Sequence, residues 1–259
     1  MDSSRNAPGP ADRSAGGGDD PSLLVISAHA ADFVWRAGGA MALYSHRGHR
    51  VTVVCLSYGE RGESARLWRQ GLSLEEVKAA RHAEASSAAE VLGAELRTLD
   101  VGDYPIVETP ELVDQLAGLY REVQPTVVLT HTAADPWNTD HALTHHLATK
   151  ARIIAQAAGH DPSTEVIGAP PVFLFEPHQS EYCGFMPDVL LDITEVWDTK
   201  VAAMQCMEGQ EHLWDYYTDV GKRRGVQGRR NSGPNLGLTT DAKGEAYQRV
   251  YPQVAAELA

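Results

Sequence analysis

The sequence has few cysteines, few aromatic residues and no long apolar run. Three of its 259 residues are cysteine and 7% are aromatic. Cys55, Cys183 and Cys206 are far apart and form no Cys-x-x-Cys pair, which argues against a disulfide framework and favours a cytoplasmic location. Apolar runs such as 23–26 and 51–56 are much shorter than the roughly 20 residues that span a bilayer, so no membrane association is expected.

Basic residues are scarce as well. The chain carries 22 Lys and Arg against 35 Asp and Glu, a formal net charge of −13. This balance argues against nucleic acid as a partner, because affinity for phosphate backbones comes mainly from basic side chains. The net negative charge does not exclude a small anionic substrate, because such a ligand responds to the local charge of its pocket. Arg61, Arg66 and Arg69 either supply such a charge or form a solvated helix face.

The chain divides into a polar beginning and a longer part that can form a core. Residues 1–21 contain many Gly, Ser, Asp and Pro but no apolar segment, which predicts a disordered tail and not a secretory signal. Residues 22–259 are predicted to form a single α/β domain, because the chain is 43% hydrophobic and its length suits one large core.

Apolar runs typical of strands alternate with helical patterns. The expected strands are 23–27, 51–57, 95–99, 126–130, 172–176 and, as the last, 189–193. The expected helices are 34–46, 75–92, 111–123, 141–158 and 194–210. Residues 221–241, with several Gly, Arg and Asn, predict an irregular segment or a loop that orders against a neighbour or a ligand. The alternation predicts a Rossmann-like parallel sheet flanked by helices, in which ligands bind beyond the carboxyl ends of the strands.

Side chains suited to metal chemistry follow two of these strands. His29 and Asp32 come after the first strand, and His141 follows the fourth within the run 135–141. Two imidazoles and a carboxylate with room for water are what a catalytic zinc site requires. On spacing alone a structural role for each histidine is the commoner outcome, because 11 histidines produce chance pairings.

A family resemblance strengthens the zinc hypothesis. The chain resembles the LmbE-like (PIG-L) superfamily, mainly zinc deacetylases, over residues 22–215. The motifs that carry the likeness are Ala28-His29-Ala30-Ala31-Asp32, Ser57-Tyr58-Gly59-Glu60-Arg61-Gly62-Glu63, Arg81-His82-Ala83-Glu84, Asn138-Thr139-Asp140-His141 and Asp192-Ile193-Thr194 with Lys200. The resemblance implies the LmbE-like α/β fold and a Zn²⁺ ion held by His29, Asp32 and His141.

Two positions depart from the deacetylase pattern. Ala31 stands where the family has the Asp that deprotonates zinc-bound water, and Asn138 stands where it has a catalytic His. Alanine cannot accept a proton, and Asn cannot change protonation state near neutral pH. Each positioned acid or base is worth roughly 10²–10⁴-fold in rate. A retained zinc site without these groups indicates a reaction other than amide hydrolysis.

One branch of the superfamily shares the departure at Ala31, an alanine in place of the catalytic Asp. The sequence is especially similar to the 4-oxalomesaconate hydratases of bacterial gallate and protocatechuate breakdown. The similar stretches are 32–39, 55–64, 175–179 and 205–214. This likeness implies a metal-dependent hydro-lyase that adds water to the C=C bond of 4-oxalomesaconate, or a related unsaturated oxo-tricarboxylate, to give 4-carboxy-4-hydroxy-2-oxoadipate.

Hydration needs a group that takes a proton from water and a group that delivers one to carbon. We nominate Glu63 as the base with Glu60 as its competitor, because both follow the second strand, and His178 as the second proton-transfer group. Each has a structural alternative. The glutamates could pair with Arg61 or Arg81 to shape the turn, and His178 could cap a loop.

A tricarboxylate substrate requires cationic partners, and arginine binds carboxylates with a planar fork. The candidate substrate-binding residues are Arg36, Arg61, Arg81, Asn138 and Lys200. An enzyme of this type is also expected to form a homo-oligomer.

Two other classes of function stay open. The first is a zinc-dependent deacetylase of an N-acetylated sugar or cofactor precursor that uses Glu63 as a substitute base. The second is a non-catalytic relative that binds metal and serves an interaction. Release of acetate would establish the first, and bound zinc without turnover would favour the second.

Overall fold

The computed structural model describes residues 21–232 and 236–255, and these form a helix-flanked sheet of seven strands. The strands are β1 (Ser22–Ser27), β2 (Arg50–Cys55), β3 (Glu95–Thr98), β4 (Val127–Thr130), β5 (Val172–Phe175), β6 (Val189–Asp192) and β7 (Gly244–Arg249). Their order across the sheet is β3-β2-β1-β4-β5-β7-β6. The expected tail, residues 1–21, lies outside the described residues except for Pro21.

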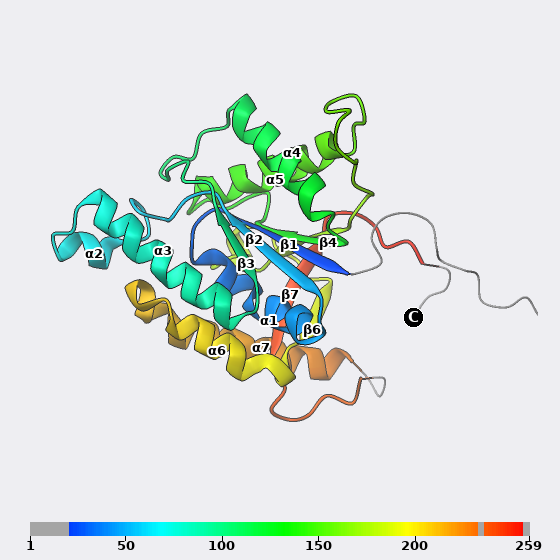
Figure 1. Cartoon of the computed structure of the whole chain (residues 1–259). Helices are drawn as coiled ribbons and strands as arrows, with labels where there is room; N and C mark the ends of the chain where they lie inside the picture. Colours follow the sequence, from blue (N-terminus) through cyan, green and yellow to red (C-terminus); the bar gives the residue numbers. More distant parts are fainter. Residues whose placement is uncertain (1–20, 233–235, 256–259) are drawn as a thin grey trace, which may run out of the picture.

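Helices cover both faces of this sheet (Figure 1). They are α1 (Asp32–His46), α2 (Ala65–Arg69), α3 (Leu74–Val91), α4 (Pro110–Val123), α5 (Thr139–Ala155), α6 (Trp197–Gln205) and α7 (Trp214–Asn231), with 3-10 turns η1 (Ser180–Tyr182), η2 (Thr194–Val196) and η3 (Glu208–Leu213). One apolar core lies between the sheet and α1, α3, α6 and α7, and a second lies under α4 and α5. No helix in the described part is long and apolar enough to cross a membrane.

The predicted α/β fold is confirmed, with one change in the sheet. Strands β1 to β5 run parallel to one another. Each helix that connects them returns the chain to the end of the sheet at which the strands begin. Strand β7 runs antiparallel between β5 and β6, so the sheet is mixed. The expectation that residues 189–193 form the last strand is therefore wrong.

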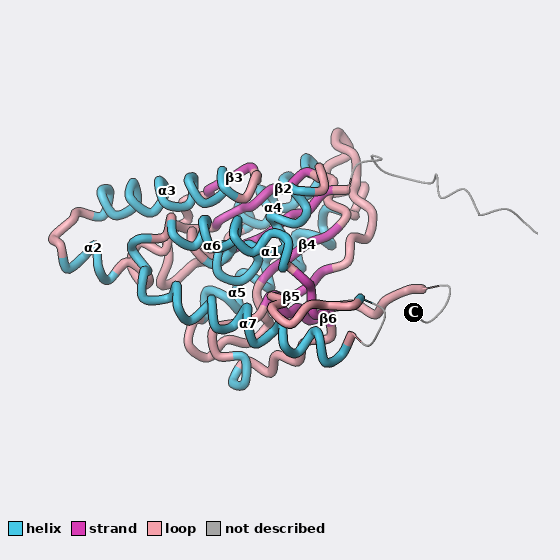
Figure 2. Tube along the Cα trace, turned by 90° about the horizontal axis from the view of Figure 1, so that it is seen from below, coloured by secondary structure: helices cyan, strands magenta, loops and turns pink. Residues whose placement is uncertain are grey.

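The expectation of an irregular segment over residues 221–241 is wrong for its first half. Helix α7 continues to Asn231 and packs beside β7. Figure 2 shows α7 in the view from below. Gly221 and Gly225 do not break this helix. A Cβ atom on Gly225 would lie 1.7 Å from the Ala242 carbonyl oxygen, so this glycine lets the helix approach the chain that leads into β7.

The expected helix 194–210 is also divided. It separates into η2, α6 and η3, and the chain leaves helical geometry at Gln210. The expected helices before it agree with α1, α3, α4 and α5 to within a few residues. Local signals explain their starts: Ser73 and Glu76 form a capping box at α3, and Thr109 caps α4.

The strand order reverses beside β1. The chain winds outward from β1 through β2 to β3, and then crosses to β4 on the other side of β1. The connections after β1 and β4 therefore diverge and leave a crevice beyond the carboxyl ends of these strands. Both motifs with the candidate zinc ligands begin at this point.

Candidate metal centre and active site

Four side chains from three strand ends converge at the crevice. His29 and Asp32 follow β1, Glu63 follows β2, and His141 lies in the first turn of α5 after β4. Their ligand atoms all lie within 4.8 Å of one another. The structure thus brings together His29, Asp32 and His141, as the family resemblance implied, and adds Glu63.

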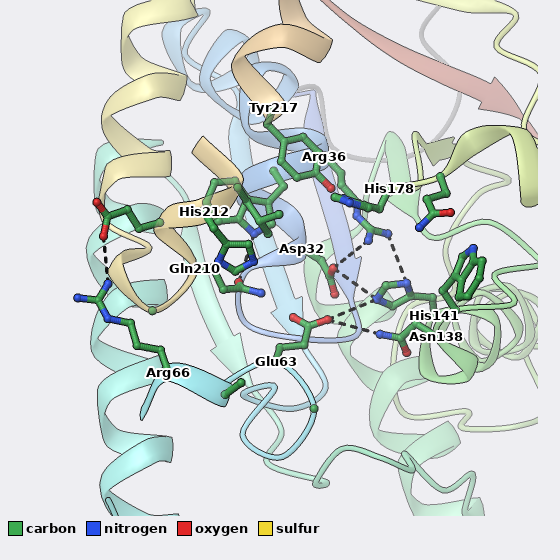
Figure 3. A pocket seen from close by; sticks show the side chains of 18 of the residues that line it. Asp32, Arg36, Glu63, Arg66, Asn138, His141, His178, Gln210, His212 and Tyr217 are labelled. Atoms are coloured by element: carbon green, nitrogen blue, oxygen red, sulfur yellow. Dashed lines mark hydrogen bonds and ion pairs between the residues drawn. The ribbon is translucent and has the colours of Figure 1, made fainter. Parts of the chain in front are cut away.

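The distances within this cluster suit a shared cation. Nδ1 of His29 lies 3.1 Å from both Oδ2 of Asp32 and Oε1 of Glu63. Nε2 of His141 lies 3.4 Å from Oδ1 of Asp32 and 3.9 Å from Oε1 of Glu63 (Figure 3). This Nε2 atom is buried and has no hydrogen-bond partner among the described residues. An unpaired imidazole nitrogen facing two carboxylates fits a metal ion, and the donor set is one that zinc accepts.

Two further carboxylates orient the imidazoles. Oδ2 of Asp135 lies 2.8 Å from Nδ1 of His141, and Oδ2 of Asp140 lies 3.4 Å from Nε2 of His29. Each contact engages the ring nitrogen that faces away from the cluster. Such partners fix the tautomer of a metal-binding histidine and raise its basicity.

The charges of the cluster influence one another strongly. Burial opposes the ionisation of Asp32, but His141, Arg36 and His131 hold the pKa of its carboxyl well below the ordinary value. Burial likewise opposes ionisation of Glu63, but the neighbouring His29 outweighs burial and lowers the pKa of this carboxyl. Both carboxyls are therefore ionised near neutral pH.

His29 shows the opposite balance. Burial works against its charge, yet Glu63, Asp140 and Asp32 raise the pKa of the imidazole well above the ordinary value. A bound cation would take the place of that proton, because a metal-binding histidine must be neutral.

His131 lies beside the cluster without belonging to it. Its Nε2 accepts a hydrogen bond of 2.9 Å from the amide of Ala28, and its ring stacks on His141 at 4.2 Å. Burial, followed by the neighbouring His141, lowers the pKa of His131 well below the ordinary value. His131 is therefore neutral, and its Nε2 atom is occupied by the Ala28 amide. Its ring packs against His141 and helps to hold that side chain in place.

A cavity of about 730 Å³ opens from the cluster. Its walls include cluster residues, three arginines, and residues of η3 and α7. The lining residues include Asp32, Arg36, Glu63, Arg66, Arg69, Asn138, His141, His178, Gln210 and Tyr217. The volume suits a small organic acid, since ligand pockets commonly enclose roughly 300–1,000 Å³.

Four of the predicted site residues beyond the metal ligands line this cavity: Arg36, Glu63, Asn138 and His178. Glu63 reaches the cluster, and Asn138 places its side-chain amide 3.4 Å from Oε1 of Glu63. Asn138 also caps α5 by accepting from the amide of Asp140. His178 lines the opposite wall, where its ring stacks on Tyr216 at 4.2 Å. Burial, followed by Arg36, lowers the pKa of His178.

Glu60 is fully buried and lies outside the cavity lining. Its carboxylate accepts from the amide of Tyr58 and lies 3.6 Å from Nη1 of Arg61. The structural alternative considered for the turn therefore describes Glu60, and the nomination of Glu60 as a base is withdrawn.

Three nominated cations also lie outside the lining. Arg61 donates to the carbonyl of Asp103 at 2.9 Å. Arg81 is fully buried and pairs with Glu84. Lys200 donates to Glu245 at 2.5 Å. Arg81 and Lys200 are buried with these partners, and the Arg61 side chain is about half exposed away from the cavity lining. None of the three faces the cavity, contrary to the prediction that they bind substrate.

Sequence reasoning missed Tyr217, Gln210 and the two orienting carboxylates. Asp135 and Asp140 lie in the run that contains His141, so acidic residues flanking a candidate ligand were the available signal. Tyr217 and Gln210 come from the other end of the chain. Gln210 lies in the stretch 205–214 that resembles the hydratases, but nothing in the sequence gave it a role. No motif included Tyr217, because only folding carries α7 to the cavity.

The comparisons with known proteins agree with this geometry. The family pattern described as "PIG-L: GlcNAc-PI de-N-acetylase" matches residues 24–152. A 4-oxalmesaconate hydratase of Pseudomonas putida is 55% identical over 242 residues, which cover 92% of this chain and 92% of the relative. The chain therefore belongs to the PIG-L family, the LmbE-like superfamily that its motifs resemble.

Two solved structures of this fold differ in how closely they resemble the chain. The crystal structure of GalB, the 4-carboxy-2-hydroxymuconate hydratase from Pseudomonas putida, matches with a TM-score of 0.89 and 55% identity, covering 92% of this chain and all (100%) of that one. The N,N'-diacetylchitobiose deacetylase from Pyrococcus horikoshii matches with a TM-score of 0.72 at 22% identity, covering 89% and 84%. The second likeness shows the shared fold, whereas the first extends to the sequence.

Proposed function

We propose that this protein is a metal-dependent hydratase that adds water to the C=C bond of 4-oxalmesaconate, or of a closely related unsaturated oxo-tricarboxylate, in the breakdown of aromatic acids. The observation that carries the proposal is the 55% identity to a 4-oxalmesaconate hydratase along 92% of both chains. The loss of the deacetylase acid–base residues also supports the proposal, because Ala31 and Asn138 stand where the hydrolases have their catalytic Asp and His. We propose zinc as the metal, held by the imidazoles of His29 and His141 and the carboxylate of Asp32, with Glu63 beside it.

A bound divalent cation would supply a Lewis acid that stabilises the negative charge developing on a substrate oxygen, an effect worth several kcal/mol. The protein's own residues supply the protons. Glu63 is ionised near neutral pH and faces the cavity, so it can take a proton from the attacking water. The water oxygen then forms its bond to one alkene carbon.

The other alkene carbon must receive a proton. We assign this step to His178, because it lines the cavity across from Glu63 and its lowered pKa makes its protonated form a stronger acid. The proton gained by Glu63 and the proton given by His178 balance, so the net addition is one water molecule. Exchange with solvent restores both groups.

Loss of the absorbance of the conjugated oxo-enoate tests the proposal. The metal-loaded protein should consume the substrate, and a chelator should abolish turnover until zinc is restored. His141→Ala should be inactive, whereas His160→Ala should match the wild type, because His160 is an exposed residue paired with Asp114.

The outcomes distinguish the rival functions. Turnover that a chelator does not affect would refute the metal role. Release of acetate from an N-acetylated sugar without hydration would establish the deacetylase instead. Bound zinc with neither activity would favour a non-catalytic relative. The expected cytoplasmic location and homo-oligomer stay predictions.

A further inference from the structure

Arg36 and Tyr217 form a polar pair in the cavity wall beside the metal cluster. Both side chains line the cavity, and they are 8% and 5% exposed. The Tyr217 hydroxyl lies near the Arg36 guanidinium in this wall (Figure 3). The two residues come from α1 and α7, and Figure 3 shows them on the same side of the cluster, next to His178.

Both side chains are held rigidly. The Tyr217 ring stacks on Trp35, with 5.4 Å between ring centroids and 14° between planes. The Arg36 guanidinium lies 6.0 Å from the centroid of Phe175 and 3.5 Å from Oδ1 of Asp32. A ligand group that binds here meets donors already in place, which reduces the entropy cost of binding.

Arg36 has capacity for an additional anion. Burial opposes its charge, but Tyr217, Asp32 and Glu63 raise the pKa of the guanidinium above its ordinary value, so it is always cationic. Its carboxylate partner Asp32 belongs to the metal cluster, where a bound cation would share that negative charge. Its Nε atom is buried and has no hydrogen-bond partner within the described residues.

Tyr217 provides a hydrogen-bond donor beside Arg36. Burial raises the pKa of its hydroxyl, so the phenol is neutral. Its hydroxyl lies near Arg36, and within the described ranges no hydrogen-bond acceptor is found for its proton. A neutral hydroxyl beside a fixed cation is the arrangement that binds a carboxylate through two charge-assisted hydrogen bonds.

We propose that Arg36 and Tyr217 together bind one carboxylate of the substrate next to the metal centre, and that Tyr217 is a specificity-determining residue. The proposal rests on the proposed function, which supplies a substrate with three carboxylates. An acid that lacks this carboxylate leaves both buried groups unpaired, and sites of this type discriminate strongly against such analogues.

Calorimetric binding of tricarballylate, an unreactive tricarboxylate, to the zinc-loaded protein tests the pair without relying on turnover. Tyr217→Phe keeps the ring on Trp35 and removes the hydroxyl, and it should weaken binding roughly ten-fold or more. Tyr120→Phe is the matched control, because Tyr120 is also fully buried but donates to the Ala148 carbonyl under the opposite face of the sheet. This control should bind as the wild type does.

A second variant and a kinetic measurement sharpen the test. Arg36→Lys keeps the charge but loses the fork, and its effect on affinity should be non-additive with that of Tyr217→Phe. With the hydratase substrate, Tyr217→Phe should raise KM more than it lowers kcat.

Unchanged affinity in Tyr217→Phe, or an equal loss in Tyr120→Phe, would overturn the inference even if the protein hydrates its substrate. A selective loss of tricarballylate binding would support the subsite even if hydration were absent. The failure of the proposed function is thus distinguishable from the failure of the subsite.

Discussion

Glu60 and Glu63 lie three residues apart and face different surroundings. Glu63 approaches two imidazoles at the cavity, whereas Glu60 faces the Tyr58 amide and Arg61 in the interior of the turn. Burial raises the pKa of Glu60, while His29 outweighs burial and lowers that of Glu63. A proton acceptor must reach the water that it activates, so position decides between the two.

Glu63→Gln is therefore expected to lower kcat by roughly 10²–10⁴-fold, because an amide cannot accept the proton. Bound zinc, measured by metal analysis, should be retained through His29, Asp32 and His141. Glu60→Gln should leave kcat within a few-fold of the wild type. Loss of zinc from Glu63→Gln would instead make Glu63 primarily a ligand, and a larger loss of kcat in Glu60→Gln would reverse the assignment.

The family motifs, together with their places after adjacent strands, predicted which side chains come together in the folded chain. His29, Asp32 and His141 follow β1 and β4, and parallel strands bring their ends to one edge. Sequence reasoning failed for Arg61, Arg81 and Lys200, because charge alone does not show whether an arginine or lysine faces a cavity or a buried carboxylate. Tyr217 carried no signal, since its contact with Arg36 joins positions far apart in the chain.

At the scale of elements, the late part of the chain was the hardest to predict. Strand β7 reads Gly-Glu-Ala-Tyr-Gln-Arg, a short segment with charged residues and no apolar run. Its Glu245 is buried because Lys200 and the amides of Gly39 and Ala40 compensate the charge. Such compensation is a tertiary effect that local propensity does not contain.

Helix α7 provides a test of this packing. Gly225→Ala would force a methyl group against the Ala242 carbonyl, and we expect it to lower the free energy of unfolding by about 1–3 kcal/mol. Gly228→Ala on the same helix meets only the Leu238 side chain, at 3.5 Å, so it should be neutral or stabilising by up to about 1 kcal/mol.

Urea unfolding followed by circular dichroism would compare the two variants. Equal stability of Gly225→Ala and Gly228→Ala would contradict the close approach of α7 to the chain before β7. A destabilised Gly228→Ala would show that the helix tolerates no side chain on that face either, and would remove the explanation based on Gly225.

At the scale of the whole molecule, the metal cluster connects segments that are distant in sequence. Its four residues come from the ends of β1 and β2 and from the start of α5, so the site exists only in the folded chain. Without a cation, Asp32 and Glu63 keep their charges close together in a buried setting. Binding of a cation to the folded state alone therefore stabilises it by linkage.

Removal of zinc is expected to lower Tm. At a free zinc concentration of 100 times Kd the ion contributes about 2.7 kcal/mol, which for a chain of this size corresponds to roughly 5–10 °C. Calorimetric scans with and without a chelator would measure the shift, which His160→Ala should retain. The double variant His29→Ala/His141→Ala should show no shift, because it lacks both imidazole ligands. A shift of the same size in that double variant would place the stabilising ion elsewhere, and no shift in the zinc-loaded wild type would mean that the cluster does not hold a metal tightly.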